Sequence, residues 1–542
     1  MKKNKSNLFS VSKKTDDFCQ TGLFWMKFIA STGFFFLLTA TIFSCSPKKN
    51  AAKKPNIIYI LADDLGYAEL GVYGQEKIET PNIDKLAESG MLFTQHYSGA
   101  PVCAPSRSVL LTGKHGGHTR IRGNDEWDAR GDVWNYMAML KDSTLEGQRP
   151  LLPGTVTIGS LLQQAGYKTG LIGKWGLGAP HTEGIPTKQG FDFFYGYNCQ
   201  RQAHTYYPTH LYKNENRVYL DNDIVPPHTS LDVGADPYDP ANYNKFNLND
   251  YAPDLMFSEL TQFVNDNQDN PFFLYWATPI PHVPLQAPKE WVDKYVAKFG
   301  DETPYNGSES LYPYFPNRYP RASYAAMVSY LDDHVGKLVQ QLKDLGLYEN
   351  TLIIFTSDNG PTYAGGADSK WFNSAKPFKI DRGWAKGYTH EGGIRVPMIA
   401  AWPGKIKPGT TTNHISAFWD VLPTLCDIAG AKTNYSTDGI SFYPTLVSDS
   451  TQAEHEFLYW EFSAYNGQQA VRMGKWKGLR LNMQEGNMDI ELFNLEEDPR
   501  EQNNLAEKYP EMVDEIARVM AAEHETPEIK SFYIKGIDNM ND

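Results

Sequence analysis

An α/β fold is predicted by two features of the chain: short apolar runs that end in polar residues, and helix-like segments that separate them. The apolar runs lie in 55–64, 167–176, 271–282 and 351–360. Continuous apolar runs of this length are typical of strands that are buried on both faces of a parallel sheet. The helix-like segments are 80–90, 157–166, 324–346 and 420–430, and several of them close on glycine. The alternation predicts a mostly parallel sheet with helices on both faces.

The pattern changes after residue 447. The segments 456–462, 469–481 and 490–495 have the composition of short antiparallel strands, and 507–525 that of a closing helix. We therefore divide the chain into a large domain at 55–447 and a smaller C-terminal subdomain at 448–542. Within the large domain, 196–320 is rich in Tyr, Pro and Asn and has little periodicity, which predicts long loops over the ligand-binding edge of the sheet.

The charge of the chain argues against one class of partner. The formal net charge is −13, and because residues 1–44 hold six Lys and two Asp, residues 45–542 carry −17. An acidic body repels nucleic acid and anionic membranes at range, so we expect no nucleic-acid partner. An anionic substrate must then be attracted locally. The five cysteines are too few and too scattered for a disulfide scaffold.

The first 44 residues have the features of an export signal. Residues 28–43 form an uncharged stretch of 16 residues after Lys27, shorter than the roughly 20 apolar residues of a spanning helix. Together with Cys45 this stretch resembles a bacterial lipoprotein signal, which implies cleavage before Cys45 and lipidation of that residue. A start at Met26 would give the signal ordinary proportions. We expect an exported protein, held by its lipid at the outer membrane or in the periplasm, with 45–54 as a linker; the alternative is a plain signal and free secretion.

The most informative segment is 101–113, which reads PVCAPSRSVLLTG. Six further segments accompany it: LADDLGY (61–67), GKWGLG (173–178), PHVPLQAP (281–288), TSDNG (356–360), KGYTHEGGIRVP (386–397) and LFNLEEDPREQNNLA (492–506). In these motifs and their order, about residues 55–510 resemble the type I sulfatases of the alkaline-phosphatase superfamily, whose signature is C-x-P-x-R followed by T-G. The resemblance implies an alkaline-phosphatase-like fold and a sulfuric ester hydrolase, with 55–447 as its catalytic domain.

The resemblance implies that Cys103 is oxidised to formylglycine by a formylglycine-generating or radical maturation enzyme. The hydrated aldehyde would be the nucleophile, because a gem-diol keeps a second hydroxyl that can collapse and expel sulfate. Pro105 suits the first turn of a helix that starts beside Cys103, and a helix N-terminus favours anions. The alternative for Cys103 is a buried structural thiol.

Two pairs of oxygen-bearing side chains follow two of the predicted strands. Asp63 and Asp64 follow one strand, and Asp358 and Asn359 follow another. A set made only of oxygens favours calcium or magnesium over zinc. The family uses calcium, so the resemblance implies one calcium ion per chain, held by these four residues and by Cys103. A helix cap is the alternative for either pair taken alone.

Positively charged and proton-carrying residues come from the resemblance, residue by residue. Arg107 would orient the formylglycine, Lys174 and Lys386 would contact sulfate as point charges, and His282 would act as general acid on the leaving oxygen.

The chain departs from the family at Gly176, where a histidine is usual in G-K-W-H-L-G. His204 or His390 could supply the missing contact, and both are also ordinary loop histidines by sequence. Together with Arg201 they are the predicted substrate-binding residues.

The predicted substrate is a sulfated polysaccharide or its oligosaccharides, such as ulvan, carrageenan or an animal sulfated glycan. Surface anchoring and aromatic loops favour this class over small aryl esters. One rival is a phosphomonoester or phosphodiester hydrolase of the same superfamily, and the other is a non-catalytic glycan-binding lipoprotein whose Cys103 never matures. A single oxygen-rich metal set and two lysines favour sulfate, since a two-zinc phosphatase needs further Asp and His ligands.

Overall fold

The computed structural model describes residues 53–307, 313–432 and 435–539, which belong to one compact unit. The predicted signal, Cys45 and most of the predicted linker lie outside the described residues. In the described part of the chain, no helix combines the length and the apolar character that crossing a membrane requires.

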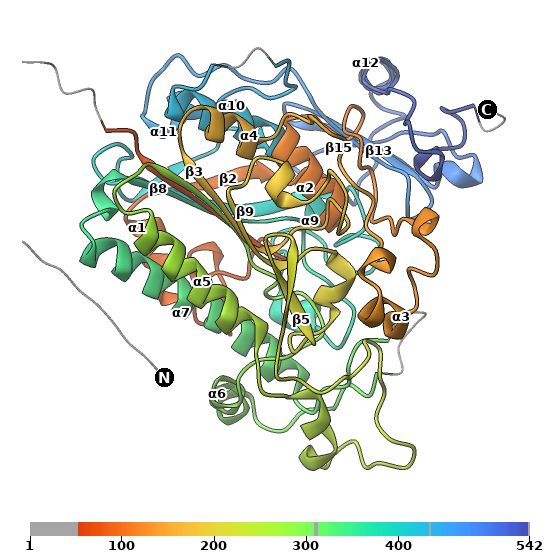
Figure 1. The fold of residues 1–542 in the computed structure, drawn as a ribbon. Helices are drawn as coiled ribbons and strands as arrows, with labels where there is room; N and C mark the ends of the chain where they lie inside the picture. Colours follow the sequence, from red (N-terminus) through yellow and green to blue (C-terminus); the bar gives the residue numbers. More distant parts are fainter. Residues whose placement is uncertain (1–52, 308–312, 433–434, 540–542) are drawn as a thin grey trace, which may run out of the picture. The chain divides into compact units, whose positions relative to one another are not determined.

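Eleven strands of the described chain form one large, mostly parallel sheet (Figure 1). In spatial order they are β10 (Thr410–Thr412), β2 (Met91–Tyr97), β9 (Arg395–Ala401), β8 (Thr351–Ser357), β1 (Asn56–Ala62), β7 (Phe272–Ala277), β3 (Lys168–Lys174), β4 (Phe193–Tyr197), β5 (His210–Lys213) and β6 (Asn216–Tyr219), with β11 (Ser416–Ala417) beside β2. The strands from β8 to β4 run parallel, and β9, β5 and β6 pair antiparallel with their neighbours. The four predicted strands are confirmed as the adjacent central strands β8, β1, β7 and β3.

Both faces of the sheet are buried, which explains why its central strands carry apolar side chains on both faces. Along β1, Tyr59 and Leu61 belong to one core cluster, and Ile58 and Ile60 belong to another. The first core contains α2 (Cys103–Thr112), α4 (Ile158–Gln164) and α10 (Val421–Ala429). The second contains α1 (Pro81–Glu88), α5 (Ala252–Asp266) and α7 (Pro320–Asp344). Helices therefore cover both faces, as the sequence predicts.

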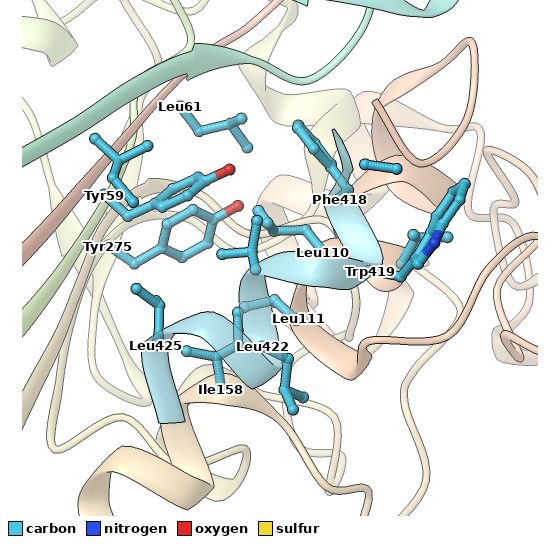
Figure 2. Close-up of a cluster of buried hydrophobic side chains, with 14 of the residues drawn as sticks. Tyr59, Leu61, Leu110, Leu111, Ile158, Tyr275, Phe418, Trp419, Leu422 and Leu425 are labelled. Carbon is cyan, nitrogen blue, oxygen red and sulfur yellow. The ribbon is translucent and has the colours of Figure 1, made fainter. Parts of the chain in front are cut away.

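The first of these cores fixes helix α2 (Figure 2). Leu110 and Leu111 of α2 lie among Leu422 and Leu425 of α10, Ile158 of α4, and the aromatic side chains of β1 and β7. All ten residues of α2 are buried, so the helix is held by close packing on every side.

The C-terminal region forms its own antiparallel sheet but shares the core of the large one. Its strands are β12 (Leu458–Phe462), β13 (Gln468–Met473), β14 (Trp476–Leu481) and β15 (Glu491–Asn494), and α12 (Pro510–Ala522) is the closing helix. Trp460 belongs to the same core cluster as Tyr59, and its indole N–H donates to the carbonyl of Ser98 at 2.9 Å. The change at residue 448 is therefore a change of sheet within one continuous core.

The prediction of long loops across 196–320 is wrong in part. The region contains the hairpin of β5 and β6, the 15-residue helix α5 and the helix α6 (Lys289–Phe299). Helix α5 buries Met256, Leu260 and Phe263, which repeat at the spacing of a helix face. Flanking Pro, Asn and Asp residues hid this short periodicity. The remaining short helices of the described chain are α3 (Tyr136–Lys141), α8 (Ser369–Phe372), α9 (Glu391–Ile394) and α11 (Tyr443–Leu446).

The shared core makes a prediction for Trp460, which is fully buried. We expect Trp460→Ala to lower the free energy of unfolding of the whole protein by about 3–5 kcal/mol, because it leaves a large cavity. Chemical denaturation should show one transition at lower denaturant. Tyr219→Ala, at a side chain 72% exposed, is the control and should change stability by less than about 0.5 kcal/mol. A second, separate transition confined to the C-terminal sheet would contradict the continuous core.

Candidate active site

Polar side chains gather where the four central strands end. Asp63 and Asp64 follow β1, and Asp358 and Asn359 follow β8. Lys174 is the last residue of β3, and the loop after β7 carries His282. Each of these side chains is at least 97% buried. The prediction that parallel strands bring these residues to one edge is confirmed by the strand order β8-β1-β7-β3.

Cys103 is the first residue of α2 and faces this group. Its thiol donates to Asp63 Oδ1 at 3.2 Å, and Lys386 Nζ lies 3.7 Å from Sγ. Burial, with the negative charge of Asp63, raises the pKa of the thiol far above its usual value. The unmodified side chain is therefore a neutral thiol, which is a poor nucleophile.

Arg107 lies one turn further along α2 and is wholly buried. Its Nε and Nη2 donate to Asp358 Oδ2 at 3.1 and 2.8 Å, and its Nη1 donates to the carbonyl of Lys174 at 2.7 Å. Ser106 Oγ also donates to the carbonyl of Asp358, at 2.6 Å. These bonds fix the N-terminus of α2 against the ends of β8 and β3.

The two predicted sulfate-binding lysines each contact one carboxylate. Lys174 Nζ lies 2.5 Å from Asp63 Oδ2, and Lys386 Nζ lies 2.6 Å from Asp64 Oδ1. With Arg107 and Asp358, the site holds three cations against three carboxylates. The described contacts therefore leave no excess of either charge.

The three carboxylates differ in pKa, because burial raises all three values and the neighbouring charges differ. Burial alone would raise the pKa of Asp63, but the positive charges of Lys174, His282 and Arg107 outweigh it, so this pKa falls far below its ordinary range. At Asp358, burial and the negative charge of Asp63 raise the pKa to about 7 despite Arg107. Burial also raises the pKa of Asp64. The pKa values of Asp64 and Asp358 are thus raised although three cations are near, and an additional cation at these oxygens would favour their ionised forms.

The residues present fit an oxygen-bound cation. Ligand atoms of Asp63, Asp64, Cys103 and His282 all lie within 4.8 Å of one another. Asn359 Nδ2 donates to Asp64 Oδ1 at 2.8 Å, whereas Asn359 Oδ1 is buried without a hydrogen-bond partner among the described residues. A buried acceptor without a partner costs about 1–3 kcal/mol. A hard cation would satisfy it, because amide and carboxylate oxygens are its preferred ligands.

His282 is held in one tautomer. Its Nδ1 lies 2.5 Å from the carbonyl of Val283, which can only accept, so Nδ1 carries the proton. Nε2 then faces the site, 3.7 Å from Asp64 Oδ2. Burial, with the positive charge of Lys386, lowers the pKa of His282 well below its usual value. Tyr206, whose role the sequence did not indicate, donates to the carbonyls of Pro279 and His282 and fixes this loop.

The three predicted substrate-binding residues lie in different places. His204 joins the site: its ring stacks on His282 at a centroid distance of 5.5 Å, and its Nδ1 is buried without a partner among the described residues. Arg201 donates to the carbonyls of Val133 and Trp134 at 2.6 and 2.7 Å. His390 packs on Trp384 at 3.9 Å and lines a cavity that includes none of the groups around Cys103.

Gly176 has a neighbour that the sequence did not indicate. Its φ is +76°, and a Cβ at this position would lie 3.3 Å from Gln200 Oε1 and 3.4 Å from Gln200 Cβ. Gln200 Oε1 is itself buried without a partner among the described residues. The space beside Gly176 is thus filled by Gln200, not by His204 or His390.

A second group, His115, His118 and Glu523, also brings potential metal-ligand atoms within 4.8 Å of one another. The backbone N–H of Gly117 donates to His115 Nδ1 at 3.2 Å, so the proton of the neutral ring is on Nε2, which donates to Glu523 at 3.0 Å. His118 Nδ1 lies 3.0 Å from Asp438 Oδ2. This group is a hydrogen-bonded junction between the loop after α2 and the segment after α12.

The fold and the site define a class of protein: a hydrolase of anionic esters that has an α/β fold. Its site places a cysteine at a helix N-terminus, among cations and oxygen ligands. The sulfatase family matches residues 55–431, and a family described as N-sulphoglucosamine sulphohydrolase, C-terminal, matches 381–526. The chain therefore belongs to the sulfatase family, the hydrolases of sulfuric esters.

Relatives of known name agree with this assignment. Arylsulfatase A of Homo sapiens is 31% identical over 455 residues, which cover 79% of this chain and 75% of that protein. N-acetylgalactosamine-6-sulfatase of Rattus norvegicus is 31% identical over 435 residues, covering 79% of this chain and 71% of that protein. The crystal structure of Ps i-CgsB in complex with k-i-k-neocarrahexaose has a TM-score of 0.67 and 29% identity, and covers 88% of this chain and 94% of that chain.

The contact between position 176 and Gln200 makes a prediction. We expect Gly176→His to lower the free energy of unfolding by about 2 kcal/mol or more, because a left-handed backbone costs a non-glycine residue about 1–2 kcal/mol and the new side chain meets Gln200. Gly154→His is the matched control, since Gly154 has a φ of +74° and no atom within 4 Å of its Cβ position.

A double-mutant cycle isolates the contact. Gln200→Ala should lower the free energy of unfolding less in the Gly176→His protein than in the wild type, as measured by chemical denaturation. Equal losses for Gly176→His and Gly154→His, with no coupling to Gln200, would show that the side chain at 176 points elsewhere.

Proposed function

We propose that the protein releases sulfate from a sulfated carbohydrate, with formylglycine made from Cys103 and a calcium ion held by Asp63, Asp64, Asp358 and Asn359. The observation that carries the proposal is the position of Cys103. It begins a helix, lies 3.2 Å from a carboxylate and 3.7 Å from a lysine, and its sulfur lies within 4.8 Å of ligand atoms of Asp63, Asp64 and His282.

Carbohydrate is the substrate class supported by the relatives. N-acetylgalactosamine-6-sulfatase takes its name from a sulfated sugar, and Ps i-CgsB was solved with k-i-k-neocarrahexaose. Both are near 30% identical to this chain. They support a glycan sulfate ester and leave open whether the glycan is algal or animal.

The calcium ion and formylglycine would supply complementary chemistry. Calcium would draw charge from a sulfate oxygen, and formylglycine would present a hydroxyl nucleophile with a second hydroxyl for release. The chain's own residues do the rest. The charges of the three cations and three carboxylates cancel, so a divalent ion at the carboxylates gives the site a net positive charge. Lys174 and Lys386 can then attract the sulfate anion locally, although the chain as a whole is acidic.

His282 is the group that can deliver a proton to the leaving sugar oxygen. Its Nδ1 is committed to the carbonyl of Val283, so the proton must be carried by Nε2, which faces the site. Burial of the ring, together with the positive charge of Lys386, lowers its pKa and opposes its protonation. A bound sulfate anion offsets that charge, which favours the imidazolium form when substrate is present.

The test is sulfate release from a panel of defined sulfated oligosaccharides, drawn from carrageenan, ulvan and chondroitin 6-sulfate, with para-nitrophenyl sulfate as a small ester. We expect release from at least one oligosaccharide, and complete loss in Cys103→Ala. Mass spectrometry of the wild-type peptide containing Cys103 should show the lower mass of the aldehyde. Calcium chelation should remove activity, and added calcium should restore it.

Two comparisons separate this proposal from its rivals. A phosphate ester of the same alcohol should react far more slowly than the sulfate ester, whereas the reverse order would indicate a phosphatase. Binding of oligosaccharides without release, together with an unmodified Cys103, would indicate a non-catalytic binding protein. Full activity of Cys103→Ala would refute the mechanism.

Export and lipid anchoring form a further part of the proposal, supported by the apolar stretch 28–43 and the cysteine that follows it. When expressed in a bacterium, the full chain should partition with membranes, and Cys45→Ala should not, because acyl chains supply the anchor. Cell fractionation with immunodetection measures this. Equal partitioning of the two proteins would argue against lipidation at Cys45.

A further inference from the structure

A cavity of about 200 Å³ lies beside the candidate active site. Its lining includes Trp384, Tyr388, His390, Tyr465, Asn482 and Glu491. These residues come from the segment on both sides of Lys386 and from the strands and turns of the C-terminal sheet. The cavity is smaller than the roughly 300–1,000 Å³ that hold drug-sized ligands, so it suits one sugar ring and not several.

Tyr465 connects the cavity with the sulfate site. Gly387 has a φ of +91°, and a Cβ on it would lie 2.7 Å from Tyr465 Cε1. Only glycine allows the ring to lie this close. The preceding residue, Lys386, reaches Asp64 at 2.6 Å. A ligand seated against Tyr465 would therefore lie beside the segment that carries Lys386, the proposed sulfate-contacting lysine.

The turn that carries Tyr465 has an unusual backbone. Tyr465, Asn466 and Gly467 have successive φ values of +50°, +69° and +74°. Left-handed conformations cost non-glycine residues about 1–2 kcal/mol each, and such strain persists where the surroundings impose it. Here Gln484 N–H donates to the Asn466 carbonyl at 2.7 Å, and Met483 N–H donates to the Gly467 carbonyl at 3.1 Å. The ring of Tyr465 packs beside Tyr388 and Phe462, at centroid distances of 5.6 and 5.9 Å, yet 47% of the residue stays exposed, so the turn presents an aromatic surface to solvent.

The polar groups of the cavity suit neutral hydroxyls. His390 is 3% exposed, and its Nδ1 has no hydrogen-bond partner among the described residues. Asn482 and Glu491, which also line the cavity, are exposed. Among the described lining residues, Glu491 is the one with a formal charge, which would repel a sulfate group.

We propose that this cavity is a subsite for a single unsulfated sugar ring, the neighbour of the sulfated unit in the oligosaccharide. The enzyme would then act on oligosaccharides in preference to monosaccharides or small esters. Tyr465 and Tyr388 supply aromatic surface for the ring, and His390, Asn482 and Glu491 bind its hydroxyls. The inference rests on the proposed function.

The experiment compares kcat/KM for the oligosaccharide that the panel identifies with kcat/KM for para-nitrophenyl sulfate. In Tyr465→Ala the ratio of the two should fall at least tenfold, through a higher KM for the oligosaccharide. Tyr219→Ala, at another exposed tyrosine, is the matched control and should keep the wild-type ratio. Thermal unfolding of each variant checks that it is folded.

A charge reversal provides a second, independent readout. Glu491 is exposed, so Glu491→Lys should fold normally. It should shift preference towards oligosaccharides that carry an additional sulfate on the neighbouring ring. The subsite is overturned if Tyr465→Ala keeps the wild-type ratio of kcat/KM values and Glu491→Lys keeps the wild-type preference among oligosaccharides. It is also overturned if Tyr465→Ala lowers kcat/KM equally for the oligosaccharide and for para-nitrophenyl sulfate. If the wild-type enzyme releases sulfate from no ester, the proposed function fails and not the subsite.

Discussion

The buried guanidinium of Arg107 is the contact on which the rest of the site depends. It joins the carboxylate of Asp358, after β8, to the carbonyl of Lys174, at the end of β3, and it does so from the helix that presents Cys103. Removing one partner of a buried ion pair leaves an uncompensated charge, which costs about 3–5 kcal/mol. Because two strand ends and one helix meet at this group, a change there would displace Asp358, Lys174 and Cys103 together.

Helix α2 is held both by apolar packing and by polar contacts of its side chains and first turn. Leu110 and Leu111 pack among α10 and α4, which positions the helix but does not fix its rotation or its end. The bonds of Ser106 and Arg107 to Asp358 do so. The N-terminus of α2 thus points at the carboxylates and lysines. Apolar packing sets where the helix lies, and hydrogen bonds set which of its residues faces the carboxylates and lysines at the strand ends.

The central strands and the groups around Cys103 could be predicted because burial on both faces leaves continuous apolar runs, and functional polar residues mark where those runs end. Helix α5 was missed because its apolar spacing is short and its flanks resemble loops. Other misses arise from contacts between distant segments. Nothing near Gly176 in the sequence indicates that Gln200 fills its space, and Arg201, a plausible anion ligand by type, is bound to carbonyls of the segment 133–134. Spacing predicts neighbours along an element, while these contacts depend on how loops pack.

The continuous core explains how the C-terminal sheet contributes to the site. If that sheet were an independent body, a side chain on its β12–β13 turn could not hold a fixed position beside Lys386. The indole of Trp460 packs into the core of the large sheet and is bonded to Ser98, and the same strand, β12, leads directly into the turn of Tyr465. Gln468, the first residue of β13, binds the carbonyl of Gly387 at 2.8 Å and the N–H of Thr389 at 3.0 Å. The β13 side of the turn is therefore bonded to the segment that follows Lys386, and the β12 side to Ser98, so Lys386 and the exposed ring of Tyr465 are placed by one continuous structure.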